Sequence, residues 1–346
     1  MKLSIIIPFV AEYPQVLFTI LNLWFELKNS DIDYEIIAID NWCEQSAEQV
    51  MWTEKCQCGK STQFKRRNFW GKQFKTSDSD NNQIPQENVC GDRVKSYAAK
   101  HKWLTYLHYD KKLSHWQAKN LGVANSTGDV LFFIDSHCMV PPGSLVDMFK
   151  QYTCPTTVDD YHGTLHMPVT YFLENDGVAL DYKLVANADI CKYHYSFTRH
   201  QPLPAPYKIP CMSTCGMMMF RSIYDDLGGW PEQLGIYGGG ENFINFTLAT
   251  LGYNIWVSNV PALHHYAEKR GYNYEYTDYK RNQIIATYMF GGELRAETFS
   301  KNCKLDEITR SRILQSVLNQ GYSQRQMLLS KQVISIDGWL KAEPWK

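Results

Sequence analysis

The chain has 346 residues, of which 44% are hydrophobic and 21% charged, so it can bury a sizeable core and is not disordered throughout. Its 35 basic residues nearly balance 36 acidic ones, so the overall charge does not point to a polyanion partner. The length fits one large α/β domain with an appendage.

The amino-terminal segment predicts the opening of an α/β domain. A β-branched strand at Leu3 to Ile7 stops at Pro8, a helical pattern follows, and Tyr34 to Ile39 forms a second strand that ends at Asp40. The first apolar run is too short for a membrane span and lacks the cleavage site of a signal peptide. We therefore expect a soluble cytoplasmic protein with no membrane anchor.

Residues 43–93 show no periodicity, which is typical of an insertion with a role of its own or of a long loop. Four cysteines form a loose group there: Cys43, Cys56, Cys58 and Cys90. Their spacing fits a zinc ribbon poorly, but a structural zinc stays open. The run Lys65-Arg66-Arg67 is either a solvated face or a contact to a phosphate backbone.

Beyond this stretch, apolar runs alternate with helical patterns, as in a parallel-rich sheet flanked by helices. The predicted strands are 103–109, 130–134, 164–172, 215–221 and 253–260. The predicted helices are His115 to Ala124, 145–152 and 243–251, and the chain again looks helical from Leu305 onward.

The segment VLFFIDSHC places acidic and basic side chains directly after a buried strand. Five apolar residues from Val130 to Ile134 suit a strand covered on both faces. Asp135 and His137 follow at i and i+2, so they point the same way on an extended chain. They could hold a divalent ion at the carboxyl end of the strand, where α/β sheets bind ligands. The alternative is an ordinary polar turn.

Later donors strengthen the metal hypothesis. Asp135, His137 and one histidine of the pair His264-His265 would form an open site for Mn²⁺ or a similar ion, which could neutralise a diphosphate leaving group. Neighbours on a strand face opposite ways, so we expect one ligand of that pair, His264. Three glycines before Glu241 would let the backbone approach a ligand. The alternative for Glu241, an acid stabilised at a helix N-terminus, is compatible with that role.

Two segments, LFFIDSHCMV and GGWPEQLGIYGGGEN, resemble the GT-A glycosyltransferases of family 2 and the polypeptide N-acetylgalactosaminyltransferases. SIIIPF is similar to their nucleotide pocket, and WQAKNLG is similar to their A-R-N-x-G helix. The resemblance covers residues 2–42 and 95–290. It implies a GT-A fold, with a Rossmann-like, mostly parallel sheet flanked by helices. Residues 1–290 would form this domain with 43–93 as an insertion, and 291–346 a helical extension.

The same resemblance implies roles for individual residues. Pro8, Glu12 and Asp40 would hold the nucleoside, and Lys119 would face the donor. Asp135, His137 and a late histidine would bind Mn²⁺ or Mg²⁺ and the diphosphate. Asp135, Glu241 and Asn242 would form the catalytic set, with the last two meeting the transferred sugar or the acceptor.

One departure from the family bears on the mechanism. Inverting members carry a Glu-Asp pair whose Asp is the general base, whereas Asn242 cannot take a proton. This favours a retaining transfer of sugar from a UDP-sugar to a hydroxyl, with an inverting enzyme as the alternative. A glycan or protein hydroxyl and a hydroxylated DNA base all remain open as acceptors. From another class, a sugar- or nucleic-acid-binding module without turnover also stays open.

Overall fold

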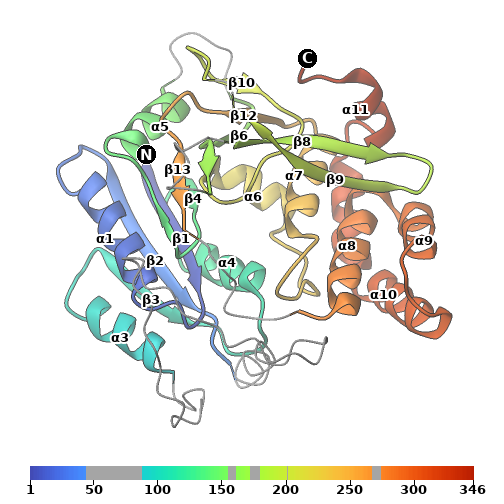
Figure 1. Cartoon of the computed structure of the whole chain (residues 1–346), viewed down its shortest axis with the longest axis horizontal. Coiled ribbons are helices and arrows are strands. Elements are labelled where there is room, and N and C mark those ends of the chain that lie inside the picture. Colours follow the sequence, from blue (N-terminus) through green and yellow to red (C-terminus); the bar gives the residue numbers. More distant parts are fainter. Residues whose placement is uncertain (44–87, 155–160, 172–179, 201, 267–273) are drawn as a thin grey trace.

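The computed structural model describes residues 1–43, 88–154, 161–171, 180–200, 202–266 and 274–346. The main feature of these residues is an eight-stranded mixed sheet with the order β10-β12-β6-β11-β4-β1-β2-β3 (Figure 1). Its strands are β1 (Lys2–Phe9), β2 (Asp33–Asp40), β3 (Leu104–His108), β4 (Val130–Phe133), β6 (Gly163–His166), β10 (Tyr207–Lys208), β11 (Met217–Phe220) and β12 (Asn254–Val257).

Strand direction decides where polar side chains gather. β1 runs parallel to both β2 and β4, so the carboxyl ends of these three strands meet at one edge of the sheet. β11 pairs antiparallel with β4 and with β6, which makes the sheet mixed. Asp40 is the last residue of β2, and Asp135 lies just beyond β4, so both occupy the same edge.

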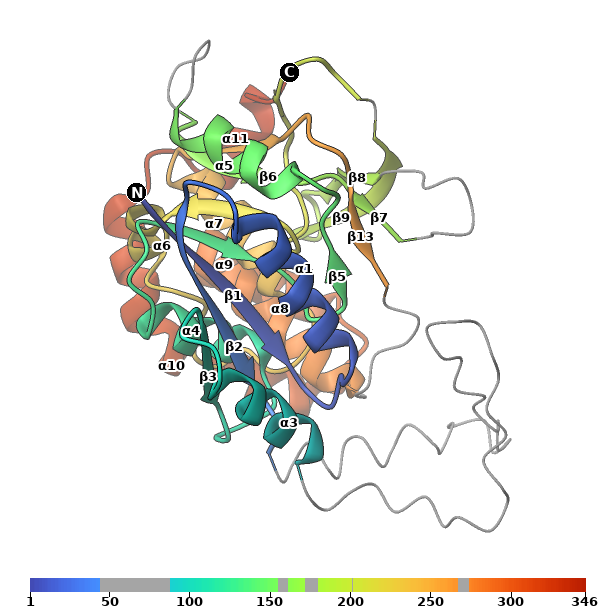
Figure 2. The same cartoon turned by 90° about the vertical axis from the view of Figure 1, so that its left-hand side faces the viewer.

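Successive residues of β1 enter two different hydrophobic clusters, because side chains alternate across a strand. Ile5 and Ile7 belong to the cluster covered by α1, α3 and α5, whereas Ile6 belongs to the cluster covered by the remaining helices. The first set is α1 (Gln15–Leu27), α3 (Val89–Ala98) and α5 (Ser144–Thr153). The second is α4 (His115–Ala124), α6 (Arg221–Leu227), α7 (Gly240–Thr250), α8 (Tyr276–Gly291), α9 (Glu293–Lys301), α10 (Glu307–Lys331) and α11 (Ile336–Ala342). Figure 2 shows α1 and α8 on opposite faces of β1.

A smaller sheet lies beside the carboxyl ends, with the order β5-β13-β7-β8-β9. Its strands are β5 (Cys138–Met139), β7 (Val169–Thr170), β8 (Leu180–Asn187), β9 (Lys192–Arg199) and β13 (Leu263–His265). The single strand expected at 164–172 is therefore two strands in two sheets. Pro168 separates them, because proline has no N–H for a ladder. The β8–β9 hairpin, absent from the sequence expectations, extends toward the carboxyl-terminal helices (Figure 1).

The stretch expected to be irregular contains the start of a helix. α3 begins at Val89, and its first turn is capped by Asn88, whose Oδ1 accepts the N–H of Gly91 at 3.0 Å. Cys56, Cys58 and the Lys65–Arg67 run lie outside the described residues, and so does the zinc hypothesis that depends on them.

The carboxyl-terminal helices pack on the main domain. α8 to α11 contribute Ile284, Phe299, Val317 and Trp339 to the hydrophobic cluster that also contains residues of α4, α6 and α7. Within the described parts of the chain, no helix combines the length and apolarity that a bilayer crossing requires. The cytoplasmic location stays a prediction.

Candidate active site

The turn after β4 is fixed to α1 by one buried hydroxyl. Thr19 Oγ1 lies 2.8 Å from the carbonyl oxygens of both Ser136 and Cys138 and accepts the N–H of Cys138 at 3.1 Å. These contacts satisfy backbone groups that would otherwise be buried without partners. The turn therefore holds Asp135 and His137 in a defined position.

Asp135, His137 and His265 come together at this edge of the sheet. Their candidate ligand atoms all lie within 4.8 Å of one another. The two Nε2 atoms of the histidines are 3.2 Å apart, and His265 Nε2 lies 3.5 Å from Asp135 Oδ2. Two imidazole nitrogens bound to one ion at about 2.1 Å and at right angles would be separated by about 3.0 Å. The spacing and the carboxylate and imidazole donors therefore fit one borderline divalent ion such as Mn²⁺, and they fit Mg²⁺ less well because that ion prefers oxygen ligands.

The histidine that joins the group is His265, whereas the sequence expectation favoured His264. β13 pairs antiparallel with β5 in a register that places His265 opposite Cys138, beside the D-S-H turn. The His264 ring stacks toward Tyr266, two residues on, with centroids 6.4 Å apart. Burial lowers the pKa of His264, and its Nδ1 has no hydrogen-bond partner among the described residues. Strand alternation thus separates the two neighbours as expected, but the register selects the other one.

Glu12 supports His137 in the described structure. Its Oε1 lies 3.0 Å from His137 Nδ1, and its Oε2 accepts a hydrogen bond from Ser136 Oγ. A carboxylate on one ring nitrogen fixes the orientation of the imidazole and leaves the other nitrogen for a ligand. The sequence expectation gave Glu12 a contact with the nucleoside, and Ser136 was not singled out.

The surroundings of Asp135 favour its charged form. Burial raises the pKa of this carboxyl, but the hydrogen bond with His265 and the positive charge of Lys119 together hold the pKa well below its usual range. Lys119 Nζ lies 3.8 Å from Asp135 Oδ1 and 3.3 Å from Thr214 Oγ1. The Lys119 side chain is fully buried, and its ammonium lies 5.0 Å from the centre of the Trp116 ring. A buried ammonium needs such partners.

Asp40 and Pro8 lie together at the ends of β2 and β1, since Pro8 pairs with Ile39 and Phe9 with Asp40. Asp40 is completely buried. Its Oδ2 accepts hydrogen bonds from Tyr106 Oη at 2.9 Å and from Asn88 Nδ2, and its Oδ1 accepts the N–H of Trp42 at 3.0 Å. The structure thus brings the predicted nucleoside residues to the expected edge, and their role stays a prediction.

The glycine run before Glu241 serves helix packing. Gly239 has φ +76°, and a Cβ there would lie 2.1 Å from the carbonyl oxygen of Asn282 in α8. A Cβ at Gly240 would lie 2.2 Å from the Trp116 ring. The close approach expected for a ligand is therefore made, at these positions, to other parts of the chain.

Glu241 in the first turn of α7 faces hydroxyl groups. Tyr195 Oη donates to its Oε2, and Ser213 Oγ and the N–H of Thr214 lie 3.3 and 3.4 Å from its Oε1. Burial raises the pKa of Glu241, and the bonds from Tyr195 and Thr214 offset only part of this effect. The group is also electrostatically coupled to Asp135 and Lys119, which places both carboxylates in one region.

Tyrosines of the smaller sheet form a chain of contacts from Glu241 to His265 of the Asp135-His137-His265 group. The Tyr195 and Tyr182 rings stack at 4.2 Å, Tyr171 Oη lies 3.4 Å from Tyr182 Oη, and the Tyr171 ring lies 4.9 Å from the His265 ring. Sequence reasoning missed these residues. The alternation of aromatic residues in KYHYSFTR is the signal that could have predicted β9.

Asn242 is held away from these carboxylates. Its Nδ2 donates to the carbonyl oxygen of Tyr193 in β9, and the Tyr193 hydroxyl accepts from Arg295 Nη1 at 2.6 Å. The residue therefore fastens the β8–β9 hairpin to α7.

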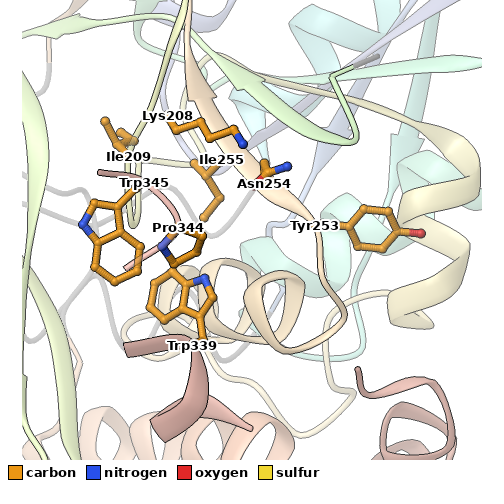
Figure 3. A pocket seen from close by; sticks show the side chains of 8 residues that line it. All are labelled: Lys208, Ile209, Tyr253, Asn254, Ile255, Trp339, Pro344 and Trp345. Atoms are coloured by element: carbon orange, nitrogen blue, oxygen red, sulfur yellow. The ribbon is translucent and has the colours of Figure 1, made fainter. Parts of the chain in front are cut away.

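A separate pocket lies between β10, β12 and α11 (Figure 3). Its lining includes Lys208, Tyr253, Trp339 and Trp345, and none of its lining residues belongs to the candidate site.

Comparisons with known proteins agree with this architecture. Residues 90–228 match the family model described as glycosyl transferase family 2. Over 218 residues the chain is 26% identical to N-acetylgalactosaminyltransferase 6 of Drosophila melanogaster, covering 55% of this chain and 30% of that protein. Over 171 residues it is 22% identical to human polypeptide N-acetylgalactosaminyltransferase 15, covering 47% and 26%.

A solved structure, that of GalNAc-T7 with UDP, GalNAc and Mn²⁺, superposes with a TM-score of 0.63 at 12% identity. The match covers 99% of this chain and 56% of that one. The chain thus spans well under two thirds of each of these proteins. The fold expected from the sequence is confirmed as GT-A, and the resemblance is borne out by the match of residues 90–228 to the glycosyl transferase family 2 model.

Proposed function

We propose that this glycosyltransferase moves a sugar from a UDP-sugar to a hydroxyl acceptor and depends on a divalent metal ion. The observation that carries the proposal is the group Asp135, His137 and His265, whose ligand atoms lie within 4.8 Å of one another at the carboxyl end of β4. The structural relative crystallised with UDP, GalNAc and Mn²⁺ supports both the donor class and the metal.

The three residues would hold a divalent ion such as Mn²⁺, which when bound would supply Lewis-acid neutralisation of the diphosphate charge. Glu12 keeps the His137 ring oriented through the 3.0 Å contact to Nδ1. Lys119 adds a fixed positive charge beside Asp135. Because it is fully buried and already positioned, this charge needs no reorganisation as the leaving group develops negative charge.

We infer that transfer proceeds with retention. In this reaction the bond from the anomeric carbon to the diphosphate breaks, the bond from that carbon to the acceptor oxygen forms, and the acceptor proton passes to the departing diphosphate. A separate base at Asn242 is chemically excluded, since an amide does not take the proton and this one donates to Tyr193. Glu241 would orient the sugar or the acceptor hydroxyl through hydrogen bonds.

A glycan or protein hydroxyl is the acceptor we propose. The names of the curated relatives include polypeptide transferases, which supports a protein hydroxyl. Among the described residues we find no feature that favours a DNA acceptor, and the Lys65–Arg67 run that motivated it lies outside them.

The test is a panel of UDP-, GDP-, TDP- and CMP-sugars, each with and without Mn²⁺, in which the melting temperature is measured. A ligand that binds only the folded state raises this temperature. We expect one UDP-sugar to do so and only with Mn²⁺. His265→Ala should abolish this response, and the neighbouring His264→Ala is the matched control that should keep it.

Turnover is measured separately as release of UDP, and the configuration of the product is read from its anomeric proton resonance. Binding without release of UDP in the presence of glycan and peptide acceptors would indicate a binding module. An inverted product would refute retention. No response of the wild-type chain to any sugar nucleotide would refute the proposal as a whole.

A further inference from the structure

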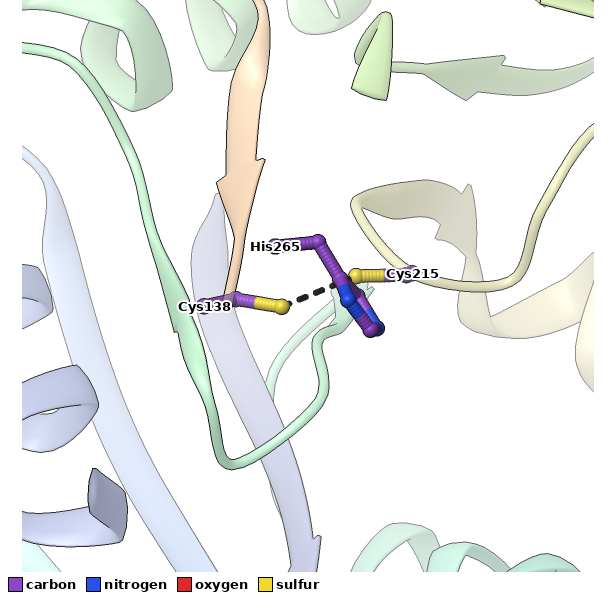
Figure 4. Close-up of side chains that lie close together, drawn as sticks. All are labelled: Cys138, Cys215 and His265. Atoms are coloured by element: carbon purple, nitrogen blue, oxygen red, sulfur yellow. Dashed lines mark hydrogen bonds between the residues drawn. The ribbon is translucent and has the colours of Figure 1, made fainter. Parts of the chain in front are cut away.

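Two buried thiols, those of Cys138 and Cys215, lie directly beside His265 (Figure 4). Cys138 and Cys215 are 0% and 2% exposed, and their sulfur atoms are 3.2 Å apart. Together with a ring nitrogen of His265 they form a second set whose candidate ligand atoms all lie within 4.8 Å. Neither thiol has a part in the transfer reaction proposed above.

The fold holds both cysteines in place through their backbones. Cys138 lies opposite His265 in the β5–β13 ladder, and its N–H donates to Thr19 Oγ1. The N–H of Cys215 donates to Ser213 Oγ at 3.1 Å, and the N–H of the next residue, Gly216, donates to the carbonyl of Phe133 in β4 at 2.9 Å. The juxtaposition therefore results from long-range pairing and not from a flexible segment.

The donor chemistry of this second set differs from that of the first. Two sulfurs and an imidazole suit Zn²⁺ or Cd²⁺, whereas one carboxylate and two imidazoles, with no sulfur, suit a borderline ion such as Mn²⁺. Two thiolates on one tetrahedral zinc, at about 2.3 Å each, would be separated by about 3.8 Å. The observed 3.2 Å requires only a small opening to reach this value.

We propose that Cys138, Cys215 and His265 bind a thiophilic divalent ion such as Zn²⁺, in a site that shares His265 with the Asp135-His137-His265 group. Binding releases the two thiol protons to solvent and leaves a further coordination position for water. A Zn²⁺ ion in this site would bind His265, which the Asp135-His137-His265 group also needs. If the proposed function holds, Zn²⁺ therefore competes with the metal ion that supports sugar transfer.

The first test is titration of the full-length, reduced protein with Co²⁺, a coloured substitute for Zn²⁺, without any sugar nucleotide. We expect a sulfur-to-cobalt charge-transfer band that saturates at one equivalent and disappears when Zn²⁺ is added. Cys215→Ser should remove the band. His137→Ala should keep it, because only the other group loses a ligand, and Cys303→Ser is the control for loss of a buried thiol elsewhere.

A second measurement avoids substitutions that could disturb folding. X-ray absorption of the wild-type protein with one equivalent of Zn²⁺ should show two sulfur ligands at about 2.3 Å. No sulfur ligands, or a cobalt band that persists in a folded Cys215→Ser variant, would overturn the site. Because neither experiment uses a sugar donor, their failure would leave the proposed transferase function untouched, and failure of transfer would not affect them.

Discussion

The candidate site contains two carboxylates whose pKa values move in opposite directions. Burial raises the pKa of both Asp135 and Glu241. Asp135 lies beside His265 and Lys119, and their interactions lower its pKa overall. Glu241 faces the hydroxyls of Tyr195 and Ser213, which are neutral, and its pKa stays raised. The charge of the partner, more than the extent of burial, decides the state of each acid.

This difference separates the two ends of the site chemically. The turn after β4 keeps an ionised carboxylate ready for a cation, since a carboxyl must be deprotonated to bind metal. The first turn of α7 keeps a carboxyl that holds its proton to higher pH, among groups that exchange hydrogen bonds. One end thus suits a metal ion, and the other suits the hydroxyls of a sugar.

The largest expected effect comes from removing the Asp135 carboxylate, which lies beside His265 and Lys119. Asp135→Ala should lower kcat by about 10³-fold or more, because loss of about 4 kcal/mol of charge stabilisation corresponds to that factor. The measurement is UDP release at saturating donor and Mn²⁺. Activity within a few-fold of the wild type would show that this carboxylate does not serve the reaction.

The role of Glu12 in orienting the His137 ring can be tested without changing any of the proposed metal ligands. Glu12→Gln should weaken Mn²⁺ binding by about 10 to 100-fold, since the group that orients a ligating histidine is removed. Calorimetry measures the affinity. Glu26→Gln, in α1 and accepting the N–H of Gly143 instead of contacting His137, is the matched control and should bind Mn²⁺ like the wild type. Equal losses in both variants would contradict the assignment.

Replacing Asn242 with a carboxylate tests whether this position could supply the base of an inverting transfer. Asn242→Asp should destabilise the fold by about 1 to 3 kcal/mol, because a buried carboxylate cannot donate to the carbonyl of Tyr193. Denaturant unfolding measures this loss. Product configuration should stay retained, since the side chain at this position faces β9 and not the acceptor. A switch to inversion would show that it reaches the acceptor.

The smallest expected effect is the contribution of Glu241 to the pH dependence of folding stability. The folded-state pKa of Glu241 lies above its usual value of 4.5, so the folded state binds more protons than the unfolded state just above that pH. This group therefore favours folding at low pH, and its contribution is lost as the pH rises. The stability of Glu241→Gln relative to the wild type should increase from pH 4 to neutral. A difference independent of pH in chemical denaturation would contradict the raised pKa.

Much of the framework follows from local sequence. The helix His115–Ala124 has the predicted bounds, and the strands that end near Asp40 and Asp135 lie where their apolar runs predict. A short β-branched and aromatic apolar run that ends in polar residues suits a strand covered on both faces, and parallel strands bring their carboxyl ends to one edge. The sequence by itself therefore determined the fold class, the edge where donors gather, and Asp135 and His137 as members of the group.

The tertiary structure decided which partners these residues meet. His265 joins His137 across 128 positions of the chain, and Glu12 reaches it across 125. The choice between His264 and His265 depends on the β5–β13 register, and a shift by one residue would exchange their faces. Likewise, the hairpin that covers Glu241, the α8 contact of Gly239 and the meeting of Cys138 with Cys215 all arise from strand pairing and helix packing. Such contacts join segments distant in the chain, and local periodicity carries no information about them.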